Sequence, residues 1–181
     1  MDIKDRFTNV YTTNQWGDNE SRSGPGSTIQ NANADIQFIK EYIEQKFEIN
    51  SKIKIIDIPC GDFNWMPILL QELETKYNIE YFGFDIVDEV ISINKLKYPK
   101  YNFNVKNIVE DLMPEGDILI CRDLLNHLPE KDNKKILLNI TESNINHIFI
   151  SNNRQMTNIN NKIVDVVNTD DFSNAIGGMS R

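Results

Sequence analysis

Residues 53–66 read "IKIIDIPCGDFNWM", an apolar run that stops at Asp57 and then turns through proline and glycine. A short apolar run bounded by turn residues predicts a buried β-strand followed by a loop. Such a strand and glycine loop commonly open a nucleotide-binding α/β fold. Here, however, Pro59 stands at the first glycine position of the usual G-x-G pattern and Phe63 at the third. The loop therefore raises the question of which ligand it accepts.

Strand and helix patterns alternate along the chain on either side of this loop. Apolar runs predict strands at residues 53–58, 80–86, 101–107, 116–123 and 147–151. Apolar positions three or four residues apart predict helices at residues 28–47, 64–76, 88–98 and 131–142. This alternation predicts an α/β fold, namely a Rossmann-like, doubly wound and mainly parallel sheet with helices on both faces.

The chain length of 181 residues is that of one domain, so we expect a single domain over residues 1–181. Within it, residues 1–27 show no sustained period and contain a Gly/Pro/Ser cluster typical of loops. Residues 28–151 form the predicted Rossmann-like core. Residues 152–181 show no convincing periodicity and are expected to be an irregular tail.

The composition narrows the expected partners. The 19 basic and 27 acidic residues give a net charge of −8, and binding to nucleic acid usually needs clustered Lys and Arg. No apolar stretch is long enough to span a bilayer, and the polar N-terminus has no signal-peptide core. The two cysteines form no C-x-x-C pattern and the two histidines have no ligand-spaced partners. We expect a cytoplasmic protein with a small-molecule partner and with no nucleic acid, membrane or metal site.

Polar side chains end four of the predicted strands, at Asp57, Asp85, Asn107 and Asp123. The carboxyl ends of parallel strands meet at one edge of the sheet, where such folds bind ligands. A pyrophosphate in that place needs backbone N–H donors and close approach of the loop. Pro59 has no N–H group and a phenylalanine adds bulk, so a nucleoside without phosphates suits the loop better.

Three motifs resemble those of class I S-adenosylmethionine-dependent methyltransferases. "IIDIPCGDF" resembles their first motif, "YFGFDI" resembles the acidic end of the second strand, and "GDILICRDLLNHL" resembles the fourth strand and its turn. The likeness spans about residues 20–151. With "SRSGPGST" near the N-terminus, the set is closer still to a small bacterial subgroup linked to surface-polysaccharide and modified-nucleotide gene clusters.

The resemblance implies a binding site for S-adenosylmethionine as the cofactor. Asp85 would accept hydrogen bonds from both ribose hydroxyls, since an ionised carboxylate has enough lone pairs for both. Gly61 would let the backbone meet the methionyl part, and Asp57 would orient the loop. Further cofactor-binding residues implied by the resemblance are Pro59, Cys60, Ile86, Asn107, Ile108, Cys121, Arg122 and Asp123, with Asn107 and Ile108 at the adenine and the last three beside the methionine moiety.

The N-terminal segment would fold over the cofactor, as it does in the resembling families. Arg22 would pair with the cofactor carboxylate. The alternative is a disordered polar leader, and Trp16 argues against it because large aromatic side chains are rare in solvated tails. Asp62 has two open roles: it contacts the cofactor amino group, or it caps the helix that begins near Asn64.

His127 is the expected catalytic base, because an imidazole titrates near neutral pH and this one follows the fourth strand. Packing of the histidine at a helix start is the alternative. The predicted reaction is methyl transfer to a small molecule, with oxygen the favoured acceptor atom. The resembling subgroup implies a nucleotide- or sugar-linked intermediate of capsular polysaccharide, with formation of an O-methyl phosphoramidate group as one form of that reaction.

Two rival functions stay open on the sequence. An NAD(P)-dependent oxidoreductase would share the sheet, although its loop would differ, and a non-catalytic domain would bind the cofactor or a partner without transfer. The sequence of the tail favours the non-catalytic domain, because it shows no pair of strands for the reversed hairpin that normally ends the fold. If the chain ends at Arg181, the fold is shortened there, and an exposed sheet edge favours a homodimer.

Overall fold

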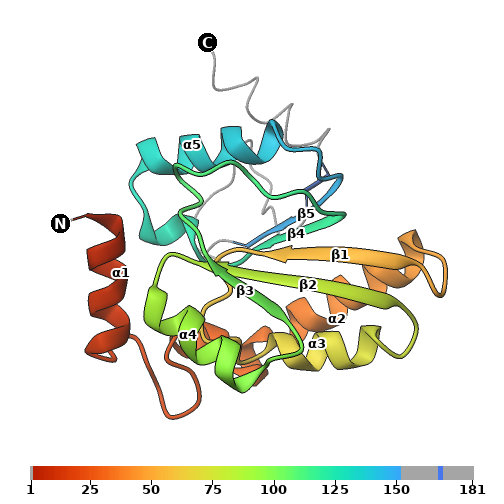
Figure 1. The fold of residues 1–181 in the computed structure, drawn as a ribbon, viewed down its shortest axis with the longest axis horizontal. Coiled ribbons are helices and arrows are strands. Elements are labelled where there is room, and N and C mark those ends of the chain that lie inside the picture. Colours follow the sequence, from red (N-terminus) through yellow and green to blue (C-terminus); the bar gives the residue numbers. More distant parts are fainter. Residues whose placement is uncertain (1, 152–166, 169–181) are drawn as a thin grey trace.

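The computed structural model describes residues 2–151 and 167–168 (Figure 1). One six-stranded sheet has the order β3-β2-β1-β4-β5-β6. Its strands are β1 Lys52–Asp57, β2 Asn78–Asp85, β3 Asn102–Val105, β4 Ile118–Cys121, β5 His147–Ile150 and β6 Val167–Asn168. The first five are parallel, and the order reverses between β1 and β4, which is where doubly wound folds bind their ligands.

Helices cover both faces of this sheet (Figure 1). They are α1 Ile3–Thr12, α2 Ile29–Lys46, α3 Met66–Leu73, α4 Asp88–Lys97 and α5 Glu130–Thr141, with short 3-10 turns at Pro25–Ser27 and Leu125–His127. α2 and α3 pack on one face and α5 packs on the other. α1 lies at the end of the sheet nearest the carboxyl ends of the strands (Figure 1).

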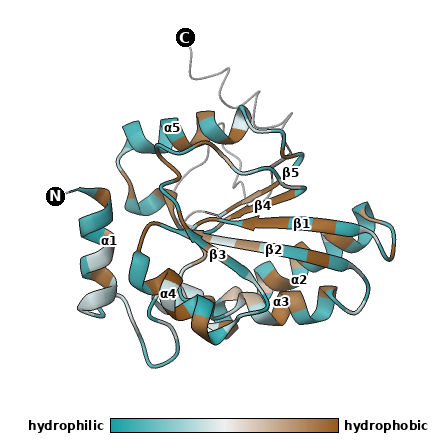
Figure 2. Cartoon of the chain, viewed as in Figure 1, coloured by the Kyte–Doolittle hydropathy of each residue, from teal (hydrophilic) through white to brown (hydrophobic). Residues whose placement is uncertain are grey.

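The core consists of two apolar clusters, one on each face. In β4, Ile118 and Ile120 belong to the cluster under α2 and α3, whereas Leu119 and Cys121 belong to the cluster under α5. This alternation follows from the two-residue period of a strand. Both faces are covered, so the central strand β4 is apolar throughout (Figure 2).

The predicted fold class is confirmed, and each predicted strand and helix has a counterpart. The boundaries shift by a few residues; for example, the predicted strand at 116–123 is β4 Ile118–Cys121. The sequence pattern did not predict a helix in residues 1–27, whereas Ile3–Thr12 forms one. That this segment covers the cofactor stays a prediction. The apolar side chains of that helix recur at helical spacing, at Ile3, Phe7, Val10 and Tyr11.

The predicted irregular tail also needs a correction. Val167–Asn168 pairs antiparallel with β5, so the region after residue 151 contributes a short strand that the sequence pattern did not predict. The other predictions for residues 152–181 lie outside the described residues.

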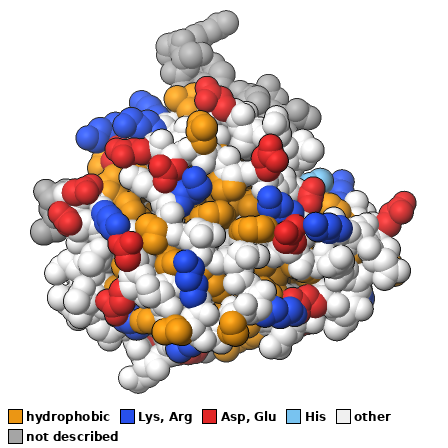
Figure 3. Space-filling model, viewed as in Figure 1, with side chains coloured by type: hydrophobic (Ala, Val, Ile, Leu, Met, Phe, Trp, Pro, Cys, Tyr) orange, Lys and Arg blue, Asp and Glu red, His pale blue; other side chains and the backbone are white. Residues whose placement is uncertain are grey.

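On the face shown in Figure 3, acidic and basic side chains are interspersed and do not form one basic patch. Opposite charges also form surface ion pairs, such as Lys4–Asp88 and Lys52–Glu80. Within residues 2–151 and 167–168, none of the helices has the length and apolar character needed to cross a membrane.

Candidate functional site

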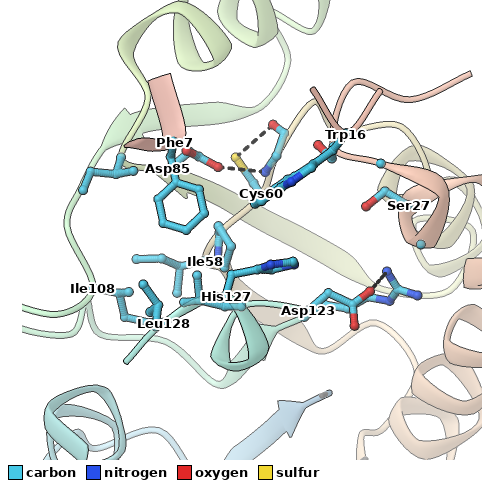
Figure 4. A pocket seen from close by; sticks show the side chains of 18 of the residues that line it. Phe7, Trp16, Ser27, Ile58, Cys60, Asp85, Ile108, Asp123, His127 and Leu128 are labelled. Atoms are coloured by element: carbon cyan, nitrogen blue, oxygen red, sulfur yellow. Dashed lines mark hydrogen bonds and ion pairs between the residues drawn. The ribbon is translucent and has the colours of Figure 1, made fainter. Parts of the chain in front are cut away.

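A cavity of about 440 Å³ lies at the carboxyl ends of the parallel strands (Figure 4). Its wall is built from α1, residues 23–27, the loop after β1, the ends of β2 and β3, and residues 122–128. Ile58, Ile108 and Leu128 lie toward one end of the view in Figure 4, and Ser27 and Asp123 toward the other. The volume is that of a site for one small molecule.

The loop after β1 uses its backbone donors internally. The N–H of Cys60 donates to the carbonyl of Phe84 (2.8 Å), that of Gly61 to Asp85 Oδ2 (3.1 Å), and that of Asp62 to Ser23 Oγ (2.9 Å). The N–H of Phe63 donates to the carbonyl of Cys60 at 3.2 Å, and Pro59 has no N–H group. In this loop, therefore, no backbone donor from 59 to 63 is left for a pyrophosphate.

Phe63 itself does not occupy the ligand side of the loop. Its ring is 1% exposed and sits in an aromatic cluster, with centroid distances of 5.1 Å to Tyr81, 4.7 Å to Tyr98 and 5.0 Å to Phe103. The expectation that its bulk blocks close approach was therefore wrong. The physical obstacle to a pyrophosphate is the set of occupied N–H donors.

Two buried carboxyl groups form the floor of the cavity. Asp85 Oδ1 accepts from the N–H of Val87 (3.0 Å) and Oδ2 from that of Gly61, which leaves lone pairs on both oxygens. Asp57 accepts from Tyr81 Oη at 2.6 Å. Burial is the main cause that raises the pKa of Asp57 to about 7 and that of Asp85 to about 6. A cation bound in the cavity would favour the ionised form of both groups.

The end of β3 contributes Asn107 and Ile108 to the wall. Asn107 Oδ1 accepts from the N–H of Val109 at 3.0 Å, which closes a local turn and presents the buried side chain of Ile108 to the cavity (Figure 4). Neighbouring Lys106 also lines the cavity, and its Nζ donates to the carbonyl of Leu112 at 2.9 Å.

Beyond β4, Arg122 and Asp123 line the cavity whereas Cys121 does not. Arg122 Nε donates to Asp35 at 2.7 Å and Nη1 to Asp123 at 2.8 Å, and its guanidinium stacks 5.6 Å from the Trp65 ring centroid. Cys121 is fully buried in the core under α5, and burial raises the pKa of its thiol to about 12. Strand alternation places it in the same apolar cluster as Leu119.

His127 lies in the wall and stacks on Trp16, with ring centroids 4.3 Å apart and planes 28° apart (Figure 4). Burial lowers the pKa of His127; Asp123 opposes this shift and Arg6 adds to it. The imidazole is therefore mostly uncharged at neutral pH, and an uncharged ring has one nitrogen lone pair that can take a proton.

Asp62 and Arg22 hold the N-terminal segment in place and do not line the cavity. Asp62 accepts from Ser21 Oγ (3.0 Å), the N–H of Arg22 (2.7 Å) and Ser23 Oγ (3.0 Å). Its expected role as a helix cap is not seen, since α3 has no side-chain cap at its start. Its contact with the cofactor amino group stays a prediction. Arg22 donates to the carbonyl of Tyr11 and pairs with Glu89 at 3.1 Å.

Twelve of the predicted site residues line this one cavity, all except Arg22, Asp62 and Cys121. The sequence prediction missed Phe7 and Tyr11 of α1, as well as Trp65, which also line it. The helical spacing of α1 was the signal for the first two. Within the described ranges, no three His, Cys, Asp or Glu side chains cluster as metal ligands do.

Comparisons with known proteins show the fold but not a sequence family. No family profile matches the chain, and no curated protein matches it in sequence. Among solved structures, magnesium protoporphyrin IX methyltransferase from Synechocystis PCC 6803 with bound S-adenosylmethionine matches with a TM-score of 0.61 and 13% identity. That match covers 98% of this chain and 86% of the other.

Two further methyltransferase structures match over smaller shares of their own length. Phosphoethanolamine N-methyltransferase 1 of Haemonchus contortus has a TM-score of 0.56 and 15% identity, over 84% of this chain and 33% of that one. Coclaurine N-methyltransferase has a TM-score of 0.51 and 16% identity, over 66% and 35%. The chain thus spans about a third of the length of these two proteins. It has the Rossmann-like fold of class I methyltransferases.

Proposed function

We propose that the protein is an S-adenosylmethionine-dependent methyltransferase that acts on a small molecule. The observation that carries the proposal is the cavity at the carboxyl ends of the strands, with Asp85 in its floor and no free backbone donor in the loop after β1. In addition, similar structures include methyltransferases solved with S-adenosylmethionine or S-adenosylhomocysteine.

The lining residues fit a phosphate-free nucleoside that carries a positive charge. Asp85 keeps lone pairs for two hydroxyl groups, and Ile86 and Ile108 offer apolar contacts beside Asn107. Arg122, a basic residue in the wall, is already paired with Asp35 and Asp123. When bound, the cofactor supplies a methyl group on a sulfonium centre. The cavity would align the methyl donor with the acceptor, and alignment is most of what methyl transfer by in-line displacement requires.

Binding tests separate this proposal from an oxidoreductase. S-adenosylmethionine at about 100 times its dissociation constant should raise the free energy of unfolding by about 2.7 kcal/mol, and NAD or NADP should not. Asp85→Ala should weaken cofactor binding about tenfold or more, because a buried acceptor of two hydroxyls is lost. The matched control Asp88→Ala removes an exposed carboxylate at the adjacent helix start and should leave affinity unchanged. Stabilisation by NAD alone would contradict the proposal.

For the acceptor we propose a hydroxyl of a nucleotide- or sugar-linked intermediate in capsular polysaccharide modification, which rests on the motif resemblance. An uncharged His127 beside the cavity supports a hydroxyl, which must lose its proton in the reaction. An O-methyl phosphoramidate product would start from an oxygen that is already anionic and needs no base. His127→Gln should therefore lower transfer to a hydroxyl by about 10²-fold and leave transfer to a phosphoramidate oxygen nearly unchanged.

A non-catalytic cofactor-binding domain is the rival that shares this cavity. It would bind S-adenosylmethionine with the same dependence on Asp85. Incubation with radiolabelled methyl donor and a panel of sugar nucleotides distinguishes the two. Label in a small-molecule product supports the enzyme, whereas tight binding with no transfer to any acceptor supports the rival.

A further inference from the structure

Asn126 lies next to His127 and also lines the cavity. Its Nδ2 is 3.3 Å from Nε2 of His127. An amide nitrogen can only donate, so this contact requires a lone pair on Nε2. In the uncharged imidazole the ring proton then sits on Nδ1. The neighbouring amide therefore selects one of the two neutral forms of the ring.

The other end of the same amide has no partner. Asn126 Oδ1 is buried and accepts no hydrogen bond from any residue that the structure describes. A buried carbonyl oxygen without a donor is unfavourable, so a donor is expected in another state of the site. A half-turn of the amide would bring Oδ1 to the position of Nδ2, facing Nε2 of His127. A protonated imidazole carries an N–H group there.

The imidazole itself is fixed in position. Trp16 stacks on its face, and the edge of that indole meets Phe7 with centroids 5.8 Å apart. Arg6 donates to the backbone carbonyl of His127. Because the ring is held on its face and through its backbone, the amide of Asn126 is the part that can turn.

We propose that Asn126 is a positioning residue that follows the proton on His127. Its Nδ2 donates to the uncharged ring, and after a half-turn its Oδ1 accepts from the protonated ring. This rests on the proposed function with His127 as base. In the proton-transfer step the acceptor hydroxyl displaces Nδ2 from Nε2, the O–H bond of the acceptor breaks, an N–H bond forms at Nε2, and the electron pair stays on the acceptor oxygen.

The test reads the ring nitrogens directly by 15N NMR on the cofactor-free protein. The chain has two histidines, so His147, whose Nδ1 lies 3.0 Å from Tyr42 Oη, serves as the internal reference. In the wild type above the pKa of His127, the proton should be on Nδ1. In Asn126→Ala it should move in part to Nε2. In Asn126→Asp, a carboxylate that only accepts should hold the proton on Nε2 and raise the pKa of His127.

Asn133→Ala is the matched control. Asn133 also has a buried Oδ1 without a partner among the described residues, and its Nδ2 ties down the same turn by donating to the carbonyl of Leu125 at 2.8 Å. It does not contact the imidazole, so the proton on His127 should stay on Nδ1. An unchanged ring proton in Asn126→Ala, or an equal change in Asn133→Ala, would overturn the proposal.

The pH profile of methyl transfer gives a second readout. The charged groups acting on His127 are Asp123 and Arg6, and both are retained in every variant. Asn126→Asp should move the acid limb of kcat/KM to higher pH, and Asn126→Ala should lower kcat about tenfold with little change in KM. If the NMR result is as expected but the wild type transfers no methyl group, the proposed function fails and the proton-following role stands.

Discussion

Gly61 sits where the loop after β1 passes under the N-terminal segment. Its φ of +53° is left-handed, and a Cβ there would lie 2.4 Å from Ser23 Oγ and 3.3 Å from Tyr11 Oη. Gly61→Ala should lower the free energy of unfolding by about 2 kcal/mol, from the left-handed conformation together with the contact. Urea denaturation measures it.

Gly17→Ala is the control for that substitution. Its φ is not left-handed, and the added Cβ meets only the end of the Asn14 side chain, which is exposed and can move. The free energy of unfolding should fall by no more than about 0.5 kcal/mol in Gly17→Ala. Equal losses for Gly17 and Gly61 would show that the loop and its cover are not tightly packed.

The carboxyl of Asp57 gives the fold a pH dependence. Its pKa rises from 3.8 to about 7 on folding, so between those values the folded state binds more protons than the unfolded state. Stability is then fully present below about pH 4 and is lost as the pH rises through about 7. The substitution Asp57→Asn should remove this dependence while keeping the contact, because an amide oxygen can still accept from Tyr81.

The measurement is the free energy of unfolding from pH 4 to 7.5 for both proteins. Relative to Asp57→Asn, the wild type should lose on the order of 3 kcal/mol across this range, since each unit of pKa shift is worth about 1.36 kcal/mol. Asp85 is present in both proteins, so its contribution cancels to first order. Parallel curves would mean that Asp57 is ionised in the folded protein throughout.

At the scale of elements, α1 and the segment that follows it form the roof of the cavity. Asp62 attaches the segment after α1 to the loop after β1, because it accepts from Ser21, Arg22 and Ser23. Asp62→Ala should remove these hydrogen bonds and increase amide hydrogen exchange in residues 16–27 by about tenfold or more, since hydrogen bonds to a charged group contribute about 1.5 to 3 kcal/mol each.

Glu89→Ala tests whether the ion pair between Glu89 and Arg22 also holds residues 16–27 in place. Both side chains are more than a third exposed, and exposed pairs contribute at most about 1 kcal/mol. Exchange in residues 16–27 should therefore change by only a fewfold. If Glu89→Ala loosened the segment as much as Asp62→Ala, the surface ion pair would be the main attachment.

At the scale of the whole molecule, the sheet separates two apolar clusters, and stability depends on both. Leu119 is fully buried under α5 in the central strand β4. Leu119→Ala should cost about 3 kcal/mol, as large-to-small core changes usually do. Leu112→Ala, at a side chain that is 85% exposed, should cost less than about 0.5 kcal/mol. Thermal or urea unfolding compares the two.

The five parallel strands, helices α2 to α5 and the edge at which the cavity lies could be predicted from the sequence. Runs such as residues 53–58 and 116–123 are apolar because both faces of a parallel sheet are buried, and this is a local signal. The polar residues that end those runs, including Asp57 and Asp85, meet at one edge because parallel strands all point the same way. The order of elements alone therefore determined where a ligand could bind.

Which side chains face the cavity was decided by tertiary contacts. Asp62 and Arg22 find partners about 40 and 67 residues away, in Ser21–Ser23 and Glu89 respectively, and no local pattern indicates such a choice. Cys121 points to the core because of the alternation within β4, whose register was not known. The occupied donors of the loop, and the pairing of Asn126 with His127, likewise depend on groups brought together only when the chain folds, because a hydrogen bond depends on distance and direction rather than on residue type.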